Sequence, residues 1–194
     1  MVIRISDNEI ESYRDGLLEM IRAIVVTREV KLSSGAISDF YIDLRRLTLD
    51  PRGSFLIANL ISDKLKTTEF DAIGGLTIGA DPIVGAICYH ASLTGSGITG
   101  FLVRKEWKAH GMKRRIEGPD LKKGAKVILV DDVVTSGGST LEAYNAVMKA
   151  GNDTIKAIAI VDREEGAREM IQSLGIGFEA LITKSEIQKS NQTI

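Results

Sequence analysis

The residues best suited to chemistry lie together in Val127–Thr140, which reads VILVDDVVTSGGST. Four consecutive apolar residues predict a strand that is buried on both faces of a parallel sheet, and two adjacent carboxylates, Asp131 and Asp132, follow it. Carboxylates repel a phosphate, but they accept hydrogen bonds from sugar hydroxyls or face a hydrated Mg²⁺. We therefore expect the pair at the carboxyl end of its strand, the edge where open α/β sheets bind ligands.

A short turn rich in glycine and hydroxyl groups follows the acid pair. Gly137 and Gly138 permit a tight bend and a close approach of the backbone to a ligand. A helix that begins at about Ser139 would present unpaired N–H groups and a positive dipole end, which suit a phosphate. The hydroxyl donors of the turn are Thr135, Ser136, Ser139 and Thr140. With no P-loop pattern present, the pair and the turn indicate a phosphorylated sugar; the plain alternative is a capped helix beside solvated acids.

The neighbouring segments predict the elements that position this stretch. Apolar residues at three- and four-residue steps predict a helix over 7–25, which Asp7 can cap. Further helices are expected over about 55–66, 83–93, 141–150 and 165–174, and strands over 71–76, 98–103, 154–161 and 177–182. This order predicts one α/β domain, 1–194, with a mostly parallel central sheet flanked by helices: an N-terminal part of about 1–50 and a core of about 70–182.

Composition excludes several classes of protein. The chain has 194 residues, 44% hydrophobic and 26% charged, which is ordinary for a globular domain. Its formal net charge of −1 gives no general attraction to nucleic acid or anionic membrane, so an anion site must be local. The single cysteine, Cys88, fits a reducing cytoplasm. Without a long apolar run or a signal-peptide pattern, we expect neither export nor membrane insertion.

A second stretch of interest is Arg104–Gly118, which reads RKEWKAHGMKRRIEG. It is dense in cations and has too few large apolar residues for a packed face, so we expect a mobile loop. A solvated basic loop is the plain alternative. A nucleic-acid patch in which Trp107 stacks on a base is another, although the rest of the chain is not basic.

Three further segments could contact a ligand. The glycine-bearing loop Thr77–Pro82 could bind an anion through backbone N–H groups, or be an ordinary connection between a strand and a helix. Arg163, expected at the carboxyl end of a strand, could hold a carboxylate or a carbonyl-bearing ring, or pair with a neighbouring glutamate. Two short extended segments, 30–35 and 38–43, predict a hairpin over one edge of the sheet.

The central stretch resembles the phosphoribosyl pyrophosphate (PRPP) signature of the type I phosphoribosyltransferases, and the chain over roughly 27–167 is similar to the orotate phosphoribosyltransferases among them. The RKEWKAHG string resembles their catalytic loop, whose cations match Arg104, Lys105, Lys108 and His110. The VDREEG string is similar to their base-recognition segment, in which Arg163 matches, and 77–82 to their pyrophosphate loop, here without a lysine. The hairpin resembles the hood that closes over the base, with matches at Ser34, Gly35, Ser38, Tyr41 and Asp43. Ser33 stands where many members have a lysine, and Lys31 is two residues away.

The resemblance implies transfer of ribose 5-phosphate from PRPP to N1 of orotate, giving orotidine 5′-phosphate and pyrophosphate in de novo pyrimidine (UMP) synthesis. It implies that Lys108, Asp131 and Asp132 are catalytic and that Thr135 and Arg163 bind orotate. The implied PRPP-binding residues are Arg104, Lys105, Lys108, His110, Asp131, Asp132, Val133, Val134, Thr135, Ser136, Gly137, Gly138 and Ser139.

It also implies a Mg²⁺ cofactor near the acid pair, held through water or PRPP, and a cytoplasmic homodimer in which loop 104–117 reaches the neighbouring site. No nucleic-acid or membrane partner is expected. Two alternatives stay open: a phosphoribosyltransferase for a purine or another pyrimidine, and a PRPP-sensing regulator without catalysis.

Overall fold

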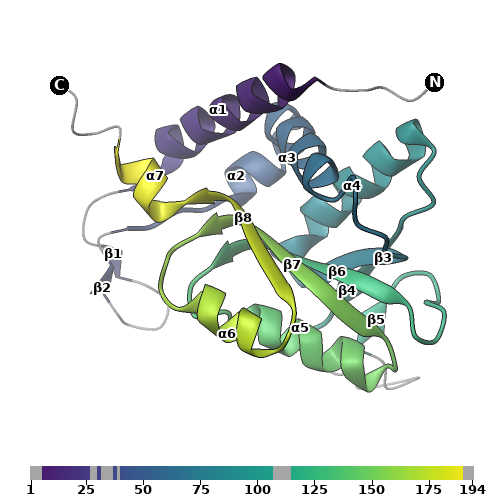
Figure 1. The fold of residues 1–194 in the computed structure, drawn as a ribbon. Coiled ribbons are helices and arrows are strands. Elements are labelled where there is room, and N and C mark those ends of the chain that lie inside the picture. Colours follow the sequence, from purple (N-terminus) through teal and green to yellow (C-terminus); the bar gives the residue numbers. More distant parts are fainter. Residues whose placement is uncertain (1–5, 27–29, 32–36, 39, 107–114, 190–194) are drawn as a thin grey trace.

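A six-stranded sheet forms the centre of the computed structural model, which describes residues 6–26, 30–31, 37–38, 40–106 and 115–189 (Figure 1). Its strand order is β5-β4-β3-β6-β7-β8, and every neighbouring pair is parallel except β4 with β5. The strands are β3 (Ala72–Leu76), β4 (Thr99–Val103), β5 (Ile116–Glu117), β6 (Lys126–Val134), β7 (Asp153–Asp162) and β8 (Gly177–Thr183). The mostly parallel sheet predicted from the sequence is confirmed.

Helices cover both faces of this sheet (Figure 1). One face carries α1 (Asp7–Ile24), α2 (Arg45–Thr48), α3 (Pro51–Lys64) and α4 (Ala80–Thr94); the other carries α5 (Gly138–Lys149) and α6 (Ala167–Ser173), and α7 (Lys184–Lys189) follows β8. A hydrophobic core lies on each face of the sheet, and strand β6 contributes to both because its successive side chains point to opposite faces. Ile128 and Val130 pack under α3 and α4, whereas Val127 and Leu129 pack with α5 and α6.

Local capping explains where the first helices begin. Ser6, and not Asp7 as predicted, caps α1: its hydroxyl accepts the N–H of Glu9, and the Glu9 carboxylate accepts the N–H of Ser6 at 2.9 Å. Asp50 caps α3 by accepting the N–H groups of the next turn, so this helix begins at Pro51, earlier than predicted. The short helix α2 was not predicted.

The predicted hairpin is confirmed as β1 (Val30–Lys31) and β2 (Ile37–Ser38), which are antiparallel. Figure 1 shows it beyond the end of the sheet at which β8 runs into α7. A bridge between Val26 and Tyr41 extends the pairing toward the core. Ser33, Ser34 and Gly35 lie outside the described residues. Among the described helices, none is long and apolar enough to cross a membrane.

Candidate functional site

The acid pair lies within strand β6 and not after it. The sequence predicted that the strand would end at Val130, but β6 continues through the pair because β7 runs beside it as far as Asp162. On the other side, the hydrogen-bonded ladder with β3 stops at Leu129. Asp131 and Asp132 therefore occupy the part of β6 that has left the β3 ladder, at the edge where parallel sheets bind ligands.

The loop between β3 and α4 packs directly against this pair. A Cβ atom at Gly79 would stand 2.6 Å from Asp132 Oδ1 and 3.3 Å from Asp131 Oδ1, so glycine leaves both carboxylates where they are. Helix α4 begins at the next residue, Ala80, with no side-chain cap at Gly79. In the first turn Pro82 has no N–H, and the N–H of Asp81 donates to the carbonyl of Ile78 at 3.2 Å. The backbone N–H groups of Gly79 and Ala80 are therefore the ones that can serve an anion.

The turn after β6 bounds the site on its other side. Gly137 has φ +83°, and a Cβ atom there would collide with Met170 Cε, so this bend needs glycine. At Gly138 a Cβ atom would meet only Ser136 Oγ, at 3.9 Å, so the backbone here faces open space. Helix α5 starts at Gly138 without a side-chain cap. Its first N–H groups can therefore serve a phosphate.

Ser139 connects this turn to the acid pair. Its Oγ–H donates to Asp131 Oδ2, and the backbone N–H of Asp132 donates to Asp131 Oδ1 at 3.0 Å. The pKa of Asp131 is raised to about 7, mainly by burial and also by the charge of Asp132, while the Ser139 hydrogen bond opposes the rise. A cation or a pair of sugar hydroxyls placed here would favour the charged carboxylate.

The cationic loop has an ordered base. Arg115 closes it: the guanidinium donates to the backbone carbonyls of Arg104 at 2.7 Å and Lys105 at 3.2 Å, and pairs with Glu142 of α5. The predicted mobile stretch of 104–118 is therefore wrong at 115–118, because β5 pairs with β4 there and Ile116 packs on the core.

The predicted cations of this loop are only partly described. Arg104 lies 3.6 Å from Glu117, across the β4–β5 pair, and Lys105 is exposed. Trp107, Lys108 and His110 lie outside the described residues.

Arg163 lies beside the hood, defined here as residues 30–43. Its backbone N–H donates to the carbonyl of Val134 at 3.0 Å, one residue before Thr135. Its guanidinium pairs with Glu165 at 2.8 Å and lies over the ring of Phe40, 5.6 Å from the centre. The structure thus joins Arg163, the hood and the end of β6, while Glu165 forms the ion pair that the sequence left open.

Sequence reasoning missed two arginines near the site. Arg115 was counted among the loop residues, although its hydrogen bonds to the carbonyls of Arg104 and Lys105 hold the base of the loop together. Arg45 hydrogen-bonds Asp43 of the hood at 2.7 Å, and this bond, with a smaller contribution from the charge of Asp132, raises the pKa of Arg45. The sequence signal for Arg45 was its position two residues after Asp43. Because α2 was not predicted, nothing in the sequence indicated that the Arg45 side chain turns back toward that carboxylate.

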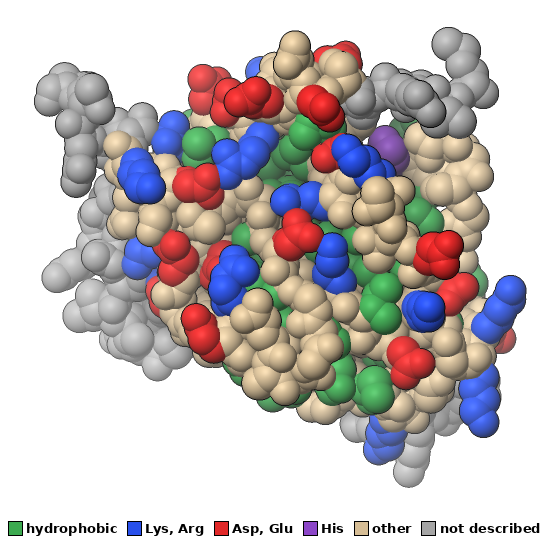
Figure 2. All heavy atoms as spheres, viewed as in Figure 1, with side chains coloured by type: hydrophobic (Ala, Val, Ile, Leu, Met, Phe, Trp, Pro, Cys, Tyr) green, Lys and Arg blue, Asp and Glu red, His purple; other side chains and the backbone are tan. Residues whose placement is uncertain are grey.

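The face that carries α1 and β8 offers little to a polyanion. Figure 2 shows acidic and basic side chains interspersed over the face that carries α1 and β8, and its described residues form no continuous basic patch. Nucleic acid binding depends on such a patch, so this face does not support the nucleic-acid alternative.

Comparison with known proteins gives the class. The sequence model of one protein family, the phosphoribosyl transferase domain, matches residues 47–191, and the chain belongs to that family. Within it, an orotate phosphoribosyltransferase of Streptomyces avermitilis is 42% identical, covering 91% of this chain and 98% of its own length. The chain is therefore a member of the orotate phosphoribosyltransferases, as the three motifs predicted.

Solved structures agree. Orotate phosphoribosyltransferase of Mycobacterium tuberculosis in complex with Fe(III) dicitrate has a TM-score of 0.80 and 40% identity, covering 91% of this chain and 99% of that one. A structure of the same enzyme in complex with PRPP has a TM-score of 0.76 and 35% identity, covering 90% and 98%.

Proposed function

We propose that this chain transfers ribose 5-phosphate from PRPP to N1 of orotate, giving orotidine 5′-phosphate and pyrophosphate for UMP synthesis. One observation carries the proposal: the acid pair lies between two uncapped helix starts, at Gly79 and at Gly137. One start can take the pyrophosphate and the other the 5′-phosphate, while the carboxylates accept the ribose hydroxyls. The similar M. tuberculosis enzyme has been solved in complex with PRPP, which supports PRPP as the sugar donor.

The chemistry follows from where charge develops. As pyrophosphate leaves, positive charge builds at the anomeric carbon, and Asp131 with Asp132 can stabilise it. Lys105, Lys108 and His110 would stabilise the departing anion, with Lys108 dominant. Loss of one such charge raises the barrier by about 3 kcal/mol, or roughly a hundredfold in rate. Closure of the loop would exclude water, which competes with orotate for the activated sugar.

Orotate would lie between the end of β6 and the hood. Thr135 can donate or accept a hydrogen bond, and the planar guanidinium of Arg163 fits a carboxylate or a ring carbonyl. Because Glu165 pairs with Arg163, orotate has to replace that carboxylate.

Mg²⁺ fits this site as an ion shared with the substrate. Within the described residues, no group of three or more His, Cys, Asp or Glu side chains could hold a metal. Asp131 and Asp132 supply two hard oxygen donors, and Mg²⁺ commonly completes its shell with water and substrate phosphates. When bound with PRPP, the ion would supply charge neutralisation for the leaving pyrophosphate.

We also infer a single-domain chain that works in the cytoplasm as a homodimer, with loop 104–117 reaching the neighbouring site and with no nucleic-acid or membrane partner. Support for the dimer comes from large apolar side chains that are exposed in the monomer. They are Leu49, Phe55, Ile78, Tyr89, Leu93 and Met148. Among them Tyr89 and Leu93 lie one turn apart on α4, and contiguous exposed apolar surface of this kind marks protein contacts.

The decisive experiment follows orotate absorbance after PRPP and Mg²⁺ are added. We expect orotate to be consumed, and Lys108→Ala to lower kcat about a hundredfold. Adenine, hypoxanthine and uracil serve as competing acceptors. Turnover of one of these without turnover of orotate would contradict the proposal.

A further inference from the structure

Two cations share one carboxylate oxygen next to Arg163. Glu165 Oε1 lies 2.8 Å from Arg163 Nη2 and 3.9 Å from Lys184 Nζ. Both cations also lie over the ring of Phe40, 5.6 Å and 5.3 Å from its centre, and this ring is fully buried. The three charged side chains together carry one excess positive charge, which a substrate carboxylate would balance.

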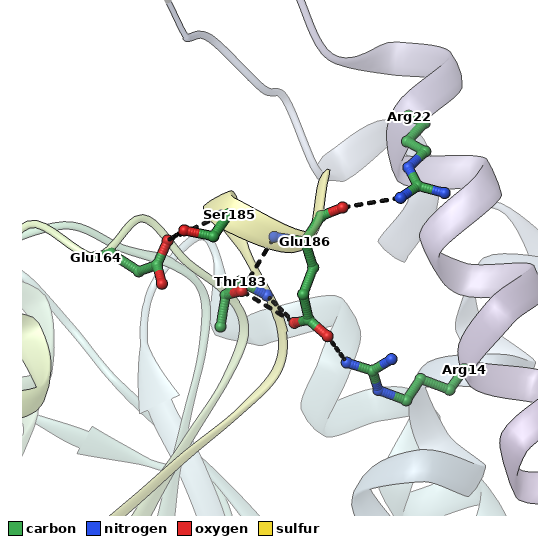
Figure 3. A network of polar contacts seen from close by, with 6 residues as sticks. All are labelled: Arg14, Arg22, Glu164, Thr183, Ser185 and Glu186. Atoms are coloured by element: carbon green, nitrogen blue, oxygen red, sulfur yellow. Dashed lines mark hydrogen bonds and ion pairs between the residues drawn. The ribbon is translucent and has the colours of Figure 1, made fainter. Parts of the chain in front are cut away.

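The position of Lys184 is set by the residue that follows it. Ser185 donates its backbone N–H at 2.8 Å and its hydroxyl at 2.5 Å to the carboxylate of Glu164 (Figure 3). Glu164 itself has φ +58°, a left-handed backbone that is uncommon for this residue type and follows Arg163 directly. The start of α7 is thereby fastened to the turn that presents Arg163.

The other side of α7 is fastened to α1 (Figure 3). Glu186 accepts the N–H of Thr183 at 2.8 Å and pairs with Arg14, while Arg22 donates to the backbone carbonyl of Glu186 at 2.8 Å. These contacts hold Lys184 beside Glu165 from an independent part of the chain. The Lys184 ammonium group, 3.9 Å from Glu165 Oε1, therefore needs only a short movement to pair closely with that carboxylate.

We propose that Lys184 is a positioning residue that takes over Glu165 when Arg163 binds the substrate carboxylate. The inference rests on the proposed function, because it needs orotate at Arg163. An anion on that guanidinium repels Glu165, whose side chain is 41% exposed and can turn. Movement toward Lys184 keeps Glu165 paired, which lowers the cost of freeing Arg163.

The test is a double-mutant cycle on the KM for orotate. Lys184→Met keeps the apolar stem over Phe40 and removes the charge; we expect KM for orotate to rise about three- to fivefold, as for a partly exposed ion pair, with KM for PRPP and kcat unchanged. Glu165→Gln removes the competitor, so KM for orotate should not rise. In the Glu165→Gln background, Lys184→Met should then have no further effect.

Lys189→Met is the matched control, since it removes an exposed lysine from the same helix. If Lys184→Met raises KM equally with Glu165 or with glutamine at that position, Lys184 contacts the substrate itself and the inference is wrong. Equal rises in KM for PRPP and orotate would show a merely structural role and also overturn it. Absence of orotate turnover in the unchanged chain would instead refute the proposed function.

Discussion

Asp131 shows how a proposed binding residue can oppose the stability of its own fold. The residue is 9% exposed and lies beside a second carboxylate, and both factors raise its pKa. The raised value, about 7, means that the folded chain binds this proton more tightly than the unfolded chain, where the ordinary value is 3.8. The resulting stability is complete below the ordinary value and is lost as the pH rises through about 7.

Asp131→Asn should therefore stabilise the substrate-free chain at alkaline pH while it lowers activity. We expect a gain of about 2 kcal/mol in the free energy of unfolding at pH 8 and little difference below about pH 4, because asparagine carries no charge to bury. Urea unfolding in EDTA across this range measures it, with the exposed Asp153→Asn as the control. Parallel pH curves for the variant and the unchanged chain would refute the expectation.

Gly79 offers a test of the acid pair without touching it. In Gly79→Ala the new Cβ would push against Asp132 Oδ1, which can turn away, so the fold should lose only about 1 kcal/mol. The displaced carboxylate no longer meets the sugar, so kcat/KM for PRPP should fall at least roughly tenfold. Gly85→Ala is the control, on the same helix with nothing within 4 Å of its Cβ. Equal activity in the two variants would count against a role for Gly79 in the site.

At the scale of elements, the β4–β5 pair and Arg115 determine where the proposed catalytic loop leaves the sheet. Arg115→Met removes the donors to the carbonyls of Arg104 and Lys105. We expect kcat to fall about fivefold, since the loop cations lose their fixed origin, with KM for orotate little changed. Steady-state kinetics in both substrates would show this. Lys122→Met is the control, because it removes an exposed cation outside the loop. It should leave kcat and KM for orotate unaltered.

Periodic and apolar patterns predicted most elements correctly. The strands and long helices of the core appear within a few residues of their expected bounds, because each pattern reports burial that the sheet then provides. The βα turn at Gly137 was also predictable, since only glycine suits its φ of +83°.

What failed depends on neighbours far away in the sequence. The length of β6 beyond Val130 is set by β7, and the order at 115–118 by pairing with β4, neither of which a local pattern contains. The site divides in the same way between local and distant information. Its Asp-Asp and Gly-Gly residues could be identified from the local sequence. The approach of Gly79 to Asp132, and of Lys184 to Glu165, arises only from tertiary packing.

At the scale of the whole molecule, the inferred dimer makes a prediction about mixtures. If loop 104–117 completes the neighbour's site, Lys108→Ala and Asp131→Asn damage different sites of a mixed dimer, and one of its two sites is intact. Mixing the two nearly inactive variants after subunit exchange should restore about a quarter of full activity, because about half of the dimers are mixed. Activity that stays at the level of the separate variants would show that each chain uses its own loop.

The fastening of α7 to α1 has a consequence for biosynthesis. A ribosome delivers the phosphate turn well before it delivers Ser185 and Glu186, whose contacts with Glu164 and Arg14 anchor the turn of Arg163. A nascent polypeptide halted before Thr183 would thus contain the phosphate turn but lack the contacts that anchor the turn of Arg163. The turn of Arg163 therefore gains these anchors only once α7 has been made and has docked on α1.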